Sequence, residues 1–324
     1  MIRSILRRIA IIPPALLLVH FLGFAYAHIV RPLRAARNPF LAAVTKPSPF
    51  WPTYTAYFKQ VINGDLGPIP PISLNSPDTI AEALVQTGLA SLGLMAIALL
   101  LSIVIGVILG LYAAHSEPPI IARWLTSIST AGLAMPSFFI GGLFFAAWFL
   151  YARWSPPGQV LPLPLQGFGW DAHLVMPVIV LMLRPTVQIA QLTAGMLVEE
   201  FERQYIVAAR SLGHTWRRIR WKDALRNIFA PVILTIAGSV RLLVGELIVV
   251  EWLFSWPGLG SLLAQTLIPS GLAINVGSSD AQTALFLNPP VVAAVLVVFA
   301  TLFLVTDLVA SIFSQAFDPR LRES

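Results

Sequence analysis

Five charged residues stand within long apolar runs, where an ionised side chain is costly and therefore a candidate for function. They are Arg184, Arg241, Glu246, Glu251 and Asp307. Charges at membrane depth pair with one another or line a polar path. Arg241 and Glu246 are five residues apart and could pair across a bundle interior, so we predict that they are paired or face a wet cavity rather than lipid. Arg184, Arg241, Glu246 and Glu251 are the candidates to line a polar, water-filled path. The alternative for each is a structural ion pair or a side chain that reaches the membrane surface.

Sequence motifs of enzymes are missing. The chain has three lysines, none followed by Ser or Thr, so no nucleotide-binding P-loop is encoded. HExxH and GxSxG patterns are absent, and the five histidines are scattered. The lack of cysteine excludes disulfides and thiolate metal sites. We therefore expect a non-catalytic chain with no cofactor and no metal.

The composition is that of a membrane protein. Hydrophobic residues make up 57% and charged residues 11% of the 324 residues, whereas soluble domains carry about 25% charged residues. The positive charges cluster between apolar runs, which argues for lipid and against nucleic acid as a partner. We predict an all-α polytopic protein forming a single membrane domain over residues 1–324, with a retained first span. Its six expected transmembrane helices are Ile9–Val30, Leu89–Ala114, Leu125–Tyr151, Leu174–Leu197, Ile228–Phe254 and Pro290–Ser311.

Loop charges predict the topology. Thirteen Lys or Arg fall on the side of the N-terminus and six on the other. Since cytoplasmic loops carry the excess of positive charge, both termini are expected in the cytoplasm. Residues 31–82 and 255–289 then form external loops, and residues 196–228 a cytoplasmic loop. In the first external loop, a short interfacial helix and a turn at Asn63–Gly64 are expected; the residues for one face of that helix are Tyr54, Tyr57, Phe58 and Val61.

The cytoplasmic loop holds seven Lys or Arg and has the pattern of a docking element. Ala208 and Ala209 are small enough to let a partner approach closely. Gly213 is suited to end a first helix with a positive φ. We predict a second short helix over His214–Asn227, with Trp216 and Ile219, and Asp223 as a further candidate, on one face. A helix pair held outside the membrane fits a groove on another protein; the alternative is a plain topogenic loop.

This loop resembles the EAA coupling loop of binding-protein-dependent ABC importer permeases, in the dipeptide/oligopeptide (nickel) branch. The matching features are the two alanines, Gly213, ALRN at Ala224–Asn227 and Pro231. Similar motifs follow in the expected order along the chain, with features of the B-type subunit: YFKQVINGDLGP, MPSF, VVEWLFSWPGLG and FDPRLR. One departure is Val207, where the family has a glutamate.

The resemblance implies a type I ABC importer permease fold in a bacterial or archaeal inner membrane. The implied partners are a second permease in a heterodimer, two cytoplasmic ATPases that hydrolyse ATP, and an external solute-binding protein. Implied ATPase-coupling residues are Ala208, Ala209, Arg210, Gly213, Arg217 and Arg218. Peptides are the implied solute. The alternatives are nickel or another small solute, an ion-driven secondary transporter, and a structural membrane protein.

Overall fold

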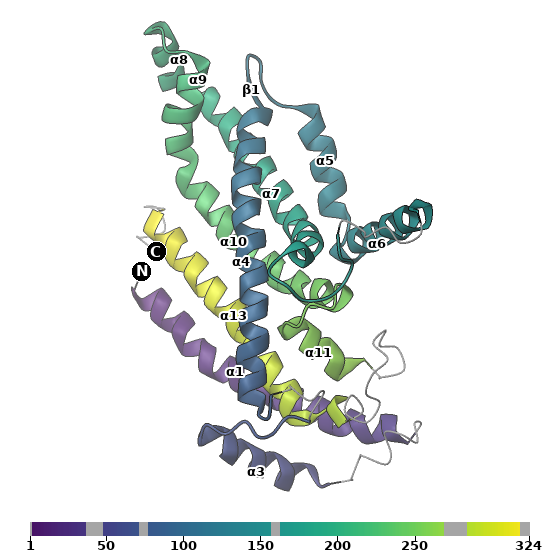
Figure 1. The fold of residues 1–324 in the computed structure, drawn as a ribbon. Coiled ribbons are helices and arrows are strands. Elements are labelled where there is room, and N and C mark those ends of the chain that lie inside the picture. Colours follow the sequence, from purple (N-terminus) through teal and green to yellow (C-terminus); the bar gives the residue numbers. More distant parts are fainter. Residues whose placement is uncertain (1, 37–47, 71–76, 157–162, 269–283, 318–324) are drawn as a thin grey trace. The chain divides into compact units, whose positions relative to one another are not determined.

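The computed structural model describes residues 2–36, 48–70, 77–156, 163–268 and 284–317. This part of the chain is helical apart from one short hairpin, β1–β2, and connecting turns (Figure 1). The elements are α1 (Ile2–Ala35), α3 (Phe50–Ile62), α4 (Ile80–Ala113), β1 (Ala114–Ser116), β2 (Pro119–Ile121), α5 (Arg123–Ala134), α6 (Ser137–Trp154), η1 (Ala172–Leu174), α7 (Val175–Phe201), α8 (Gln204–Ser211), α9 (Trp216–Arg218), η2 (Ile219–Ala224), α10 (Leu225–Leu253), α11 (Leu259–Leu267) and α13 (Pro289–Phe317).

Six helical segments within the described residues are long and apolar enough to cross a membrane, which confirms the predicted number. They are Ile5–Ala35, Ile80–Ala113, Ser137–Trp154, Ala172–Phe201, Trp216–Leu253 and Pro289–Phe313. Helices extend into both ends of the predicted external loop at 31–82. Residues 31–35 belong to α1, and residues 80–82 begin α4.

The predicted third span, Leu125–Tyr151, is also wrong as a single helix. It is divided into α5 and α6 at Met135 and Pro136, which both have extended backbone angles. Proline disfavours the helical conformation of the residue before it and has no N–H to donate. The break therefore falls where the sequence places Pro136, and only α6 is long enough to span.

The described chain divides into two compact units. Unit 1 comprises Met1–Ile5, Gly93–Phe254 and Thr306–Ser324, and unit 2 comprises Leu6–Leu92 and Ser255–Val305. In unit 1, α7 packs along α10, and α4 approaches α7 through a GxxxG pattern. A Cβ added at Gly106 would lie 2.8 Å from the Thr186 carbonyl oxygen, and one at Gly110 2.7 Å from that of Ala190. Small residues at this spacing let two membrane helices touch along their backbones.

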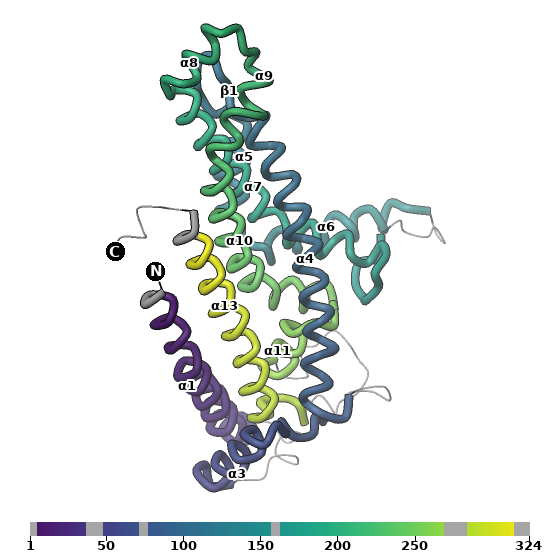
Figure 2. Tube along the Cα trace, turned by 90° about the vertical axis from the view of Figure 1, so that its left-hand side faces the viewer, coloured from purple at the N-terminus to yellow at the C-terminus, as the bar shows by residue number. Residues whose placement is uncertain are grey.

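One end of unit 1 is built from the β1–β2 hairpin together with α8 and α9. Figure 1 and Figure 2 agree in bringing these elements together. The hairpin is antiparallel and pairs Ala114 with Ile121. Together with Ala122 it joins α4 to α5, since α4 ends at Ala113 and α5 begins at Arg123.

In unit 2, α3 packs against α1 and α13. Phe50, Tyr54, Tyr57 and Val61 recur at helical spacing and form the face of α3 that contacts Phe24 and Ala293. The predicted short helix is thus confirmed, as is the turn after it, where Gly64 has a φ of +83°.

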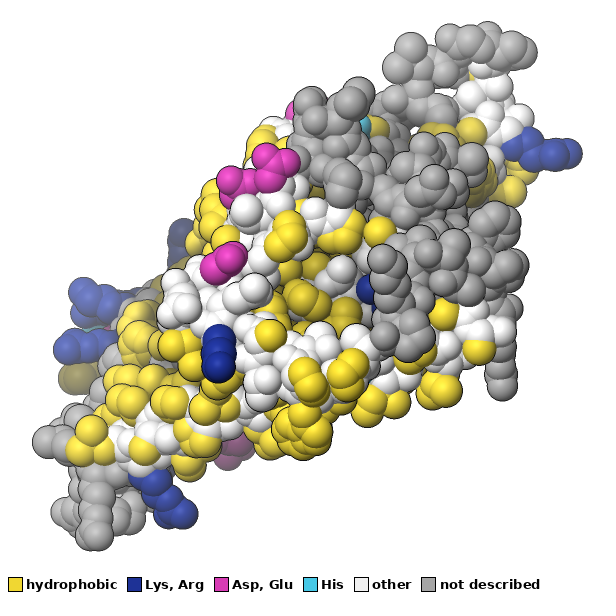
Figure 3. Space-filling view, turned by 90° about the horizontal axis from the view of Figure 1, so that it is seen from below, with side chains coloured by type: hydrophobic (Ala, Val, Ile, Leu, Met, Phe, Trp, Pro, Cys, Tyr) yellow, Lys and Arg dark blue, Asp and Glu magenta, His cyan; other side chains and the backbone are white. Residues whose placement is uncertain are grey.

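Hydrophobic side chains are exposed over much of the described surface, as Figure 3 shows for one face. Such exposure is expected of a chain whose solvent is lipid. Several sequence features lie outside the described residues: the NVGSSDAQT stretch, residues 318–322 of the FDPRLR motif, and four charges of the topology count, namely Arg37, Lys46, Arg320 and Arg322.

Candidate functional site

α8 ends in a turn that depends on glycine. The N–H of His214 donates to the Ala209 carbonyl at 3.0 Å, and the N–H of Gly213 donates to the Arg210 carbonyl at 2.9 Å. These two bonds form a Schellman motif, which ends a helix with a residue in the left-handed region. Gly213 has a φ of +83°, which confirms the conformation predicted for it.

A second helix begins in this half of the loop, at Trp216, as predicted, but it does not end at Asn227, so the prediction of a separate short helix is wrong. The Thr215 hydroxyl caps α9 by accepting the Arg218 N–H at 3.4 Å. From there the chain runs through the π-helix η2 into α10 as one helical segment, Trp216–Leu253. Neither glycine nor proline occurs between Thr215 and Pro231, so nothing in the sequence ends the helix before the span.

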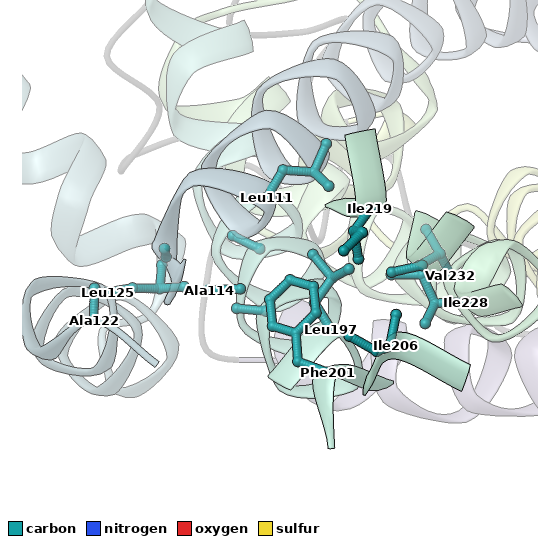
Figure 4. Close-up of a cluster of buried hydrophobic side chains, with 14 residues drawn as sticks. Leu111, Ala114, Ala122, Leu125, Leu197, Phe201, Ile206, Ile219, Ile228 and Val232 are labelled. Atoms are coloured by element: carbon teal, nitrogen blue, oxygen red, sulfur yellow. The ribbon is translucent and has the colours of Figure 1, made fainter. Parts of the chain in front are cut away.

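The inner face of the loop packs into an apolar cluster (Figure 4). Phe201 lies beside Leu197 and Ile206, and Ile219 closes the cluster from the start of η2. Ala209 is half-buried against this cluster, whereas Ala208 is exposed. The two alanines therefore differ: Ala208 is open to a partner, and Ala209 serves the packing of the loop itself.

The outer face of the loop is apolar and basic. Leu212 is 79% exposed, Val207 63% and Trp221 46%. Trp221 also lines a shallow cavity of about 610 Å³, together with Thr215, Arg217, Arg218 and Lys222. Large apolar side chains that are exposed next to charges mark an interaction surface.

Arg210 contacts the loop and the hairpin. Its guanidinium donates to the His214 carbonyl at 3.2 Å and lies 4.8 Å from the ring centre of Trp216. It also lies 3.7 Å from a carboxylate oxygen of Glu117 in the β1–β2 turn. These contacts hold the tip of the loop together, while Arg217 and Arg218 remain exposed.

Glu200, which sequence reasoning did not single out, ties the loop to both flanking helices. Its Oε1 accepts the Tyr205 hydroxyl at 2.7 Å and the Asn227 amide at 2.9 Å. Burial, followed by the hydrogen bond to Glu200, raises the pKa of the Tyr205 phenol, so this donor keeps its proton. A glutamate in the last turn of a span, next to a basic loop, was the available signal.

The membrane-depth charges form two pairs that differ from the predicted one. Arg184 of α7 pairs with Glu246 of α10, and Arg241 pairs with Asp307 of α13 at 3.0 Å. The predicted Arg241–Glu246 pair is wrong. Five residues place two side chains about 140° apart around a helix axis, so they face different neighbours.

Polar groups accompany the buried pair. Thr186 and Thr193 of α7 are buried, and their hydroxyls have no hydrogen-bond partner within the described residues. Glu251 is fully buried and lies two residues before the end of α10. In the described part of the chain, no three His, Cys, Asp or Glu side chains come close enough to hold a metal ion. These polar groups are thus buried among the helices of unit 1, and Thr193 packs against Gly110 of α4.

Residues 106–323 match the family model described as binding-protein-dependent transport system inner membrane component. The chain belongs to this family. The match covers the whole loop between α7 and α10, both membrane pairs and the β1–β2 hairpin. The chain is accordingly a multi-pass membrane component of a transport system.

Similar curated proteins extend the match to almost the full length. The dipeptide transport system permease protein DppB of Escherichia coli (strain K12) is 27% identical, over 99% of each chain. The oligopeptide transport system permease protein AppB of Bacillus subtilis (strain 168) is 27% identical, over 89% of this chain and 85% of its own. DppB of Lactococcus lactis subsp. cremoris (strain MG1363) is 26% identical, over 99% of this chain and 100% of its own.

Proposed function

We propose that the chain is a permease subunit of an ATP-driven importer that takes up peptides. It forms the translocation path with a second permease, binds two cytoplasmic ATPases, and receives solute from an external binding protein. The family match and the names of the similar proteins support this assignment. The observation that carries it is the exposed apolar and basic outer face of the loop between α7 and α10.

The outer face is the proposed ATPase contact. Leu212 and Ala208 enter a groove on the ATPase, and Arg217 and Arg218 meet acidic side chains at its rim. Gly213 sets the angle between α8 and α9, and Arg210 and Ala209 hold the tip from within. Closure of the ATPase pair on ATP moves this tip. Because Trp216–Leu253 is one helical segment, the movement passes into a membrane span.

We further propose that the solute passes along the polar groups of α7 and α10. The Arg184–Glu246 pair and the hydroxyls of Thr186 and Thr193 offer charged and hydrogen-bonding groups in an apolar surrounding. A peptide backbone presents both donors and acceptors, which such a lining satisfies. Glu251 and Arg241 are the further candidates on α10.

The orientation follows from the loop charges. The loop between α7 and α10 and both termini face the cytoplasm, and α3 faces the outside. The proposed location is a bacterial or archaeal cell membrane, and the bacterial sources of the similar proteins support it.

A growth assay tests whether the transported solute is a peptide. In a strain that lacks this chain and requires one amino acid, we expect growth on the free amino acid but not on a dipeptide that contains it. The intact chain should restore growth on the dipeptide. Uptake of radioactive nickel should be the same with and without the chain. Restored nickel uptake without restored dipeptide growth would replace peptides by nickel as the solute.

A single exposed residue tests the ATPase contact. Leu212→Asp places a charge at the centre of the proposed contact, where desolvation of an unpaired charge opposes binding. We expect the variant to insert normally and to lose co-purification of the ATPase. Leu212→Met keeps the apolar surface and should retain it. Equal recovery of the ATPase with both variants would contradict the proposed contact.

A further inference from the structure

We propose that the β1–β2 hairpin and the loop between α7 and α10 form one rigid bracket, with Arg220 as its positioning residue. Movement of the loop then reaches α4 and α5 as well as α7 and α10. The inference rests on the proposed function, since that function supplies the movement. Nothing in the sequence assigned a role to the hairpin.

A shared apolar core joins the two parts of the bracket. Leu111 and Ala114 at the end of α4, and Leu125 in α5, belong to the same buried cluster as Ile206 and Ile219 of the loop (Figure 4). Ala114 and Ile219 are fully buried, and the other three are 1% exposed. Close packing at this density resists sliding, so the hairpin cannot shift without disturbing the loop.

Arg220 adds a directional contact to this core. Its Nη2 donates to the carbonyl oxygen of Ala114 at 2.8 Å, and its guanidinium lies 5.9 Å from the ring centre of Phe201. Ala114 is the first residue of β1 and pairs with Ile121 across the hairpin. A half-buried hydrogen bond from a charged donor is among the stronger ones in proteins. Arg220 therefore fixes the base of the hairpin to η2.

A second contact lies at the turn of the hairpin. Glu117 is 3.7 Å from Arg210, which also holds the His214 carbonyl and the Trp216 ring. A partly exposed ion pair is weak by itself. Together with Arg220 it gives the hairpin two points of attachment, and two points prevent rotation about either one.

The covalent connections turn this bracket into a second route for movement. The hairpin follows α4 without an intervening residue and is separated from α5 by Ala122 alone, which is itself buried in the shared core. Displacement of the loop thus displaces the adjoining ends of both helices. If the hairpin were flexible, movement of the loop would not displace α4 or α5.

Cross-linking tests whether the bracket moves as one body. The chain has no cysteine, so the double variant Glu117→Cys, Arg210→Cys offers two defined thiols. Because this variant lacks the Glu117–Arg210 ion pair, its own activity before cross-linking is the reference. The complete importer is reconstituted with this variant, and the thiols are joined by a flexible bis-maleimide. If the bracket moves as one body, joining its two parts removes no motion that transport needs. We therefore expect stimulated ATP hydrolysis and uptake of a radiolabelled dipeptide each to change less than about twofold on cross-linking, a small difference in free energy. A block of both activities would overturn the inference.

Substitution tests Arg220 as a positioning residue. Arg220→Met removes its hydrogen bond and charge, and we expect dipeptide uptake per ATP hydrolysed to fall roughly tenfold at equal amounts of assembled complex. Arg123→Met removes one positive charge from an exposed position beside the hairpin and should leave the ratio unchanged. Arg220→Lys, which keeps a charged donor, should restore part of it. An unchanged ratio for Arg220→Met would contradict the proposal.

The outcomes separate the two proposals. If the intact chain fails to bind any ATPase, the proposed function is wrong, and the bracket loses its role with it. If the intact chain transports the dipeptide and cross-linking stops it, the bracket alone is wrong.

Discussion

Arg184 of α7 and Glu246 of α10 form a buried ion pair that joins two membrane helices across 62 residues of sequence. Arg184 also donates to the Leu133 carbonyl at 3.4 Å, at the end of α5. The pair thereby connects three helices of unit 1. The second carboxylate oxygen of Glu246 is buried and has no hydrogen-bond partner within the described residues, so the pair retains an acceptor for a further polar group.

Replacing one partner of this pair should destabilise the protein more than replacing both partners. Loss of one partner of a buried pair leaves an uncompensated charge and costs about 3–5 kcal/mol. We expect Arg184→Met and Glu246→Leu each to lower the thermal unfolding temperature in detergent, followed by tryptophan fluorescence. The double variant should be more stable than either single one. Strictly additive losses would show that the two side chains do not interact.

Arg241 and Asp307 should tolerate an exchange of charges. They pair at 3.0 Å between α10 and α13, and an uncompensated charge at mid-membrane costs about 2.5–3.5 kcal/mol on insertion scales. We expect Arg241→Asp and Asp307→Arg each to reduce the amount of membrane-inserted protein, measured by immunoblot. The double exchange should restore most of it. Failure of the double exchange at wild-type transcript levels would argue for separate roles of the two charges.

Gly213 should accept asparagine but not valine. A positive φ costs an ordinary residue roughly 1–2 kcal/mol, and asparagine tolerates it better than most. No atom within the described chain lies within 4 Å of a Cβ built at this position. We therefore expect normal insertion of both variants, with ATPase co-purification lost for Gly213→Val and kept for Gly213→Asn. Loss with both would indicate that bulk against the partner, and not backbone strain, decides the effect.

Reporter fusions should place the two sides of the protein. A reporter that is active only outside the cytoplasm should be silent when fused after Arg210 and active when fused after Gly64. The excess of positive charge on the loop side is the reason. The reverse pattern would invert the orientation proposed for the whole chain.

Local sequence signals were sufficient for much of the fold. The six spans follow from apolar length, and α3 follows from aromatic residues at helical spacing. The left-handed Gly213 follows from its place after a short helix. Each of these features is decided by residues within a few turns of one another, so spacing along the chain is enough to find it.

Features decided by distant residues were missed. The partners of Arg241 and Arg184 lie 66 and 62 residues away, and no local spacing encodes them. The half-buried state of Ala209 depends on a cluster that also includes residues of α4 and α5. The prediction of a single helix over Leu125–Tyr151 failed for a different reason. It gave more weight to the apolar composition of this run than to Pro136, which breaks the helix.

In the proposed function, the uninterrupted helical segment from Trp216 to Leu253 serves as a lever. Its 38 residues correspond to a length of roughly 57 Å, so a tilt of only about 5° displaces one end against the other by roughly 5 Å. A displacement of this size therefore needs no unfolding or sliding within the segment itself. The displacement for a given tilt grows with the length of the segment. The first fifteen residues after Thr215 contain neither glycine nor proline, so the helix continues from the loop into the span.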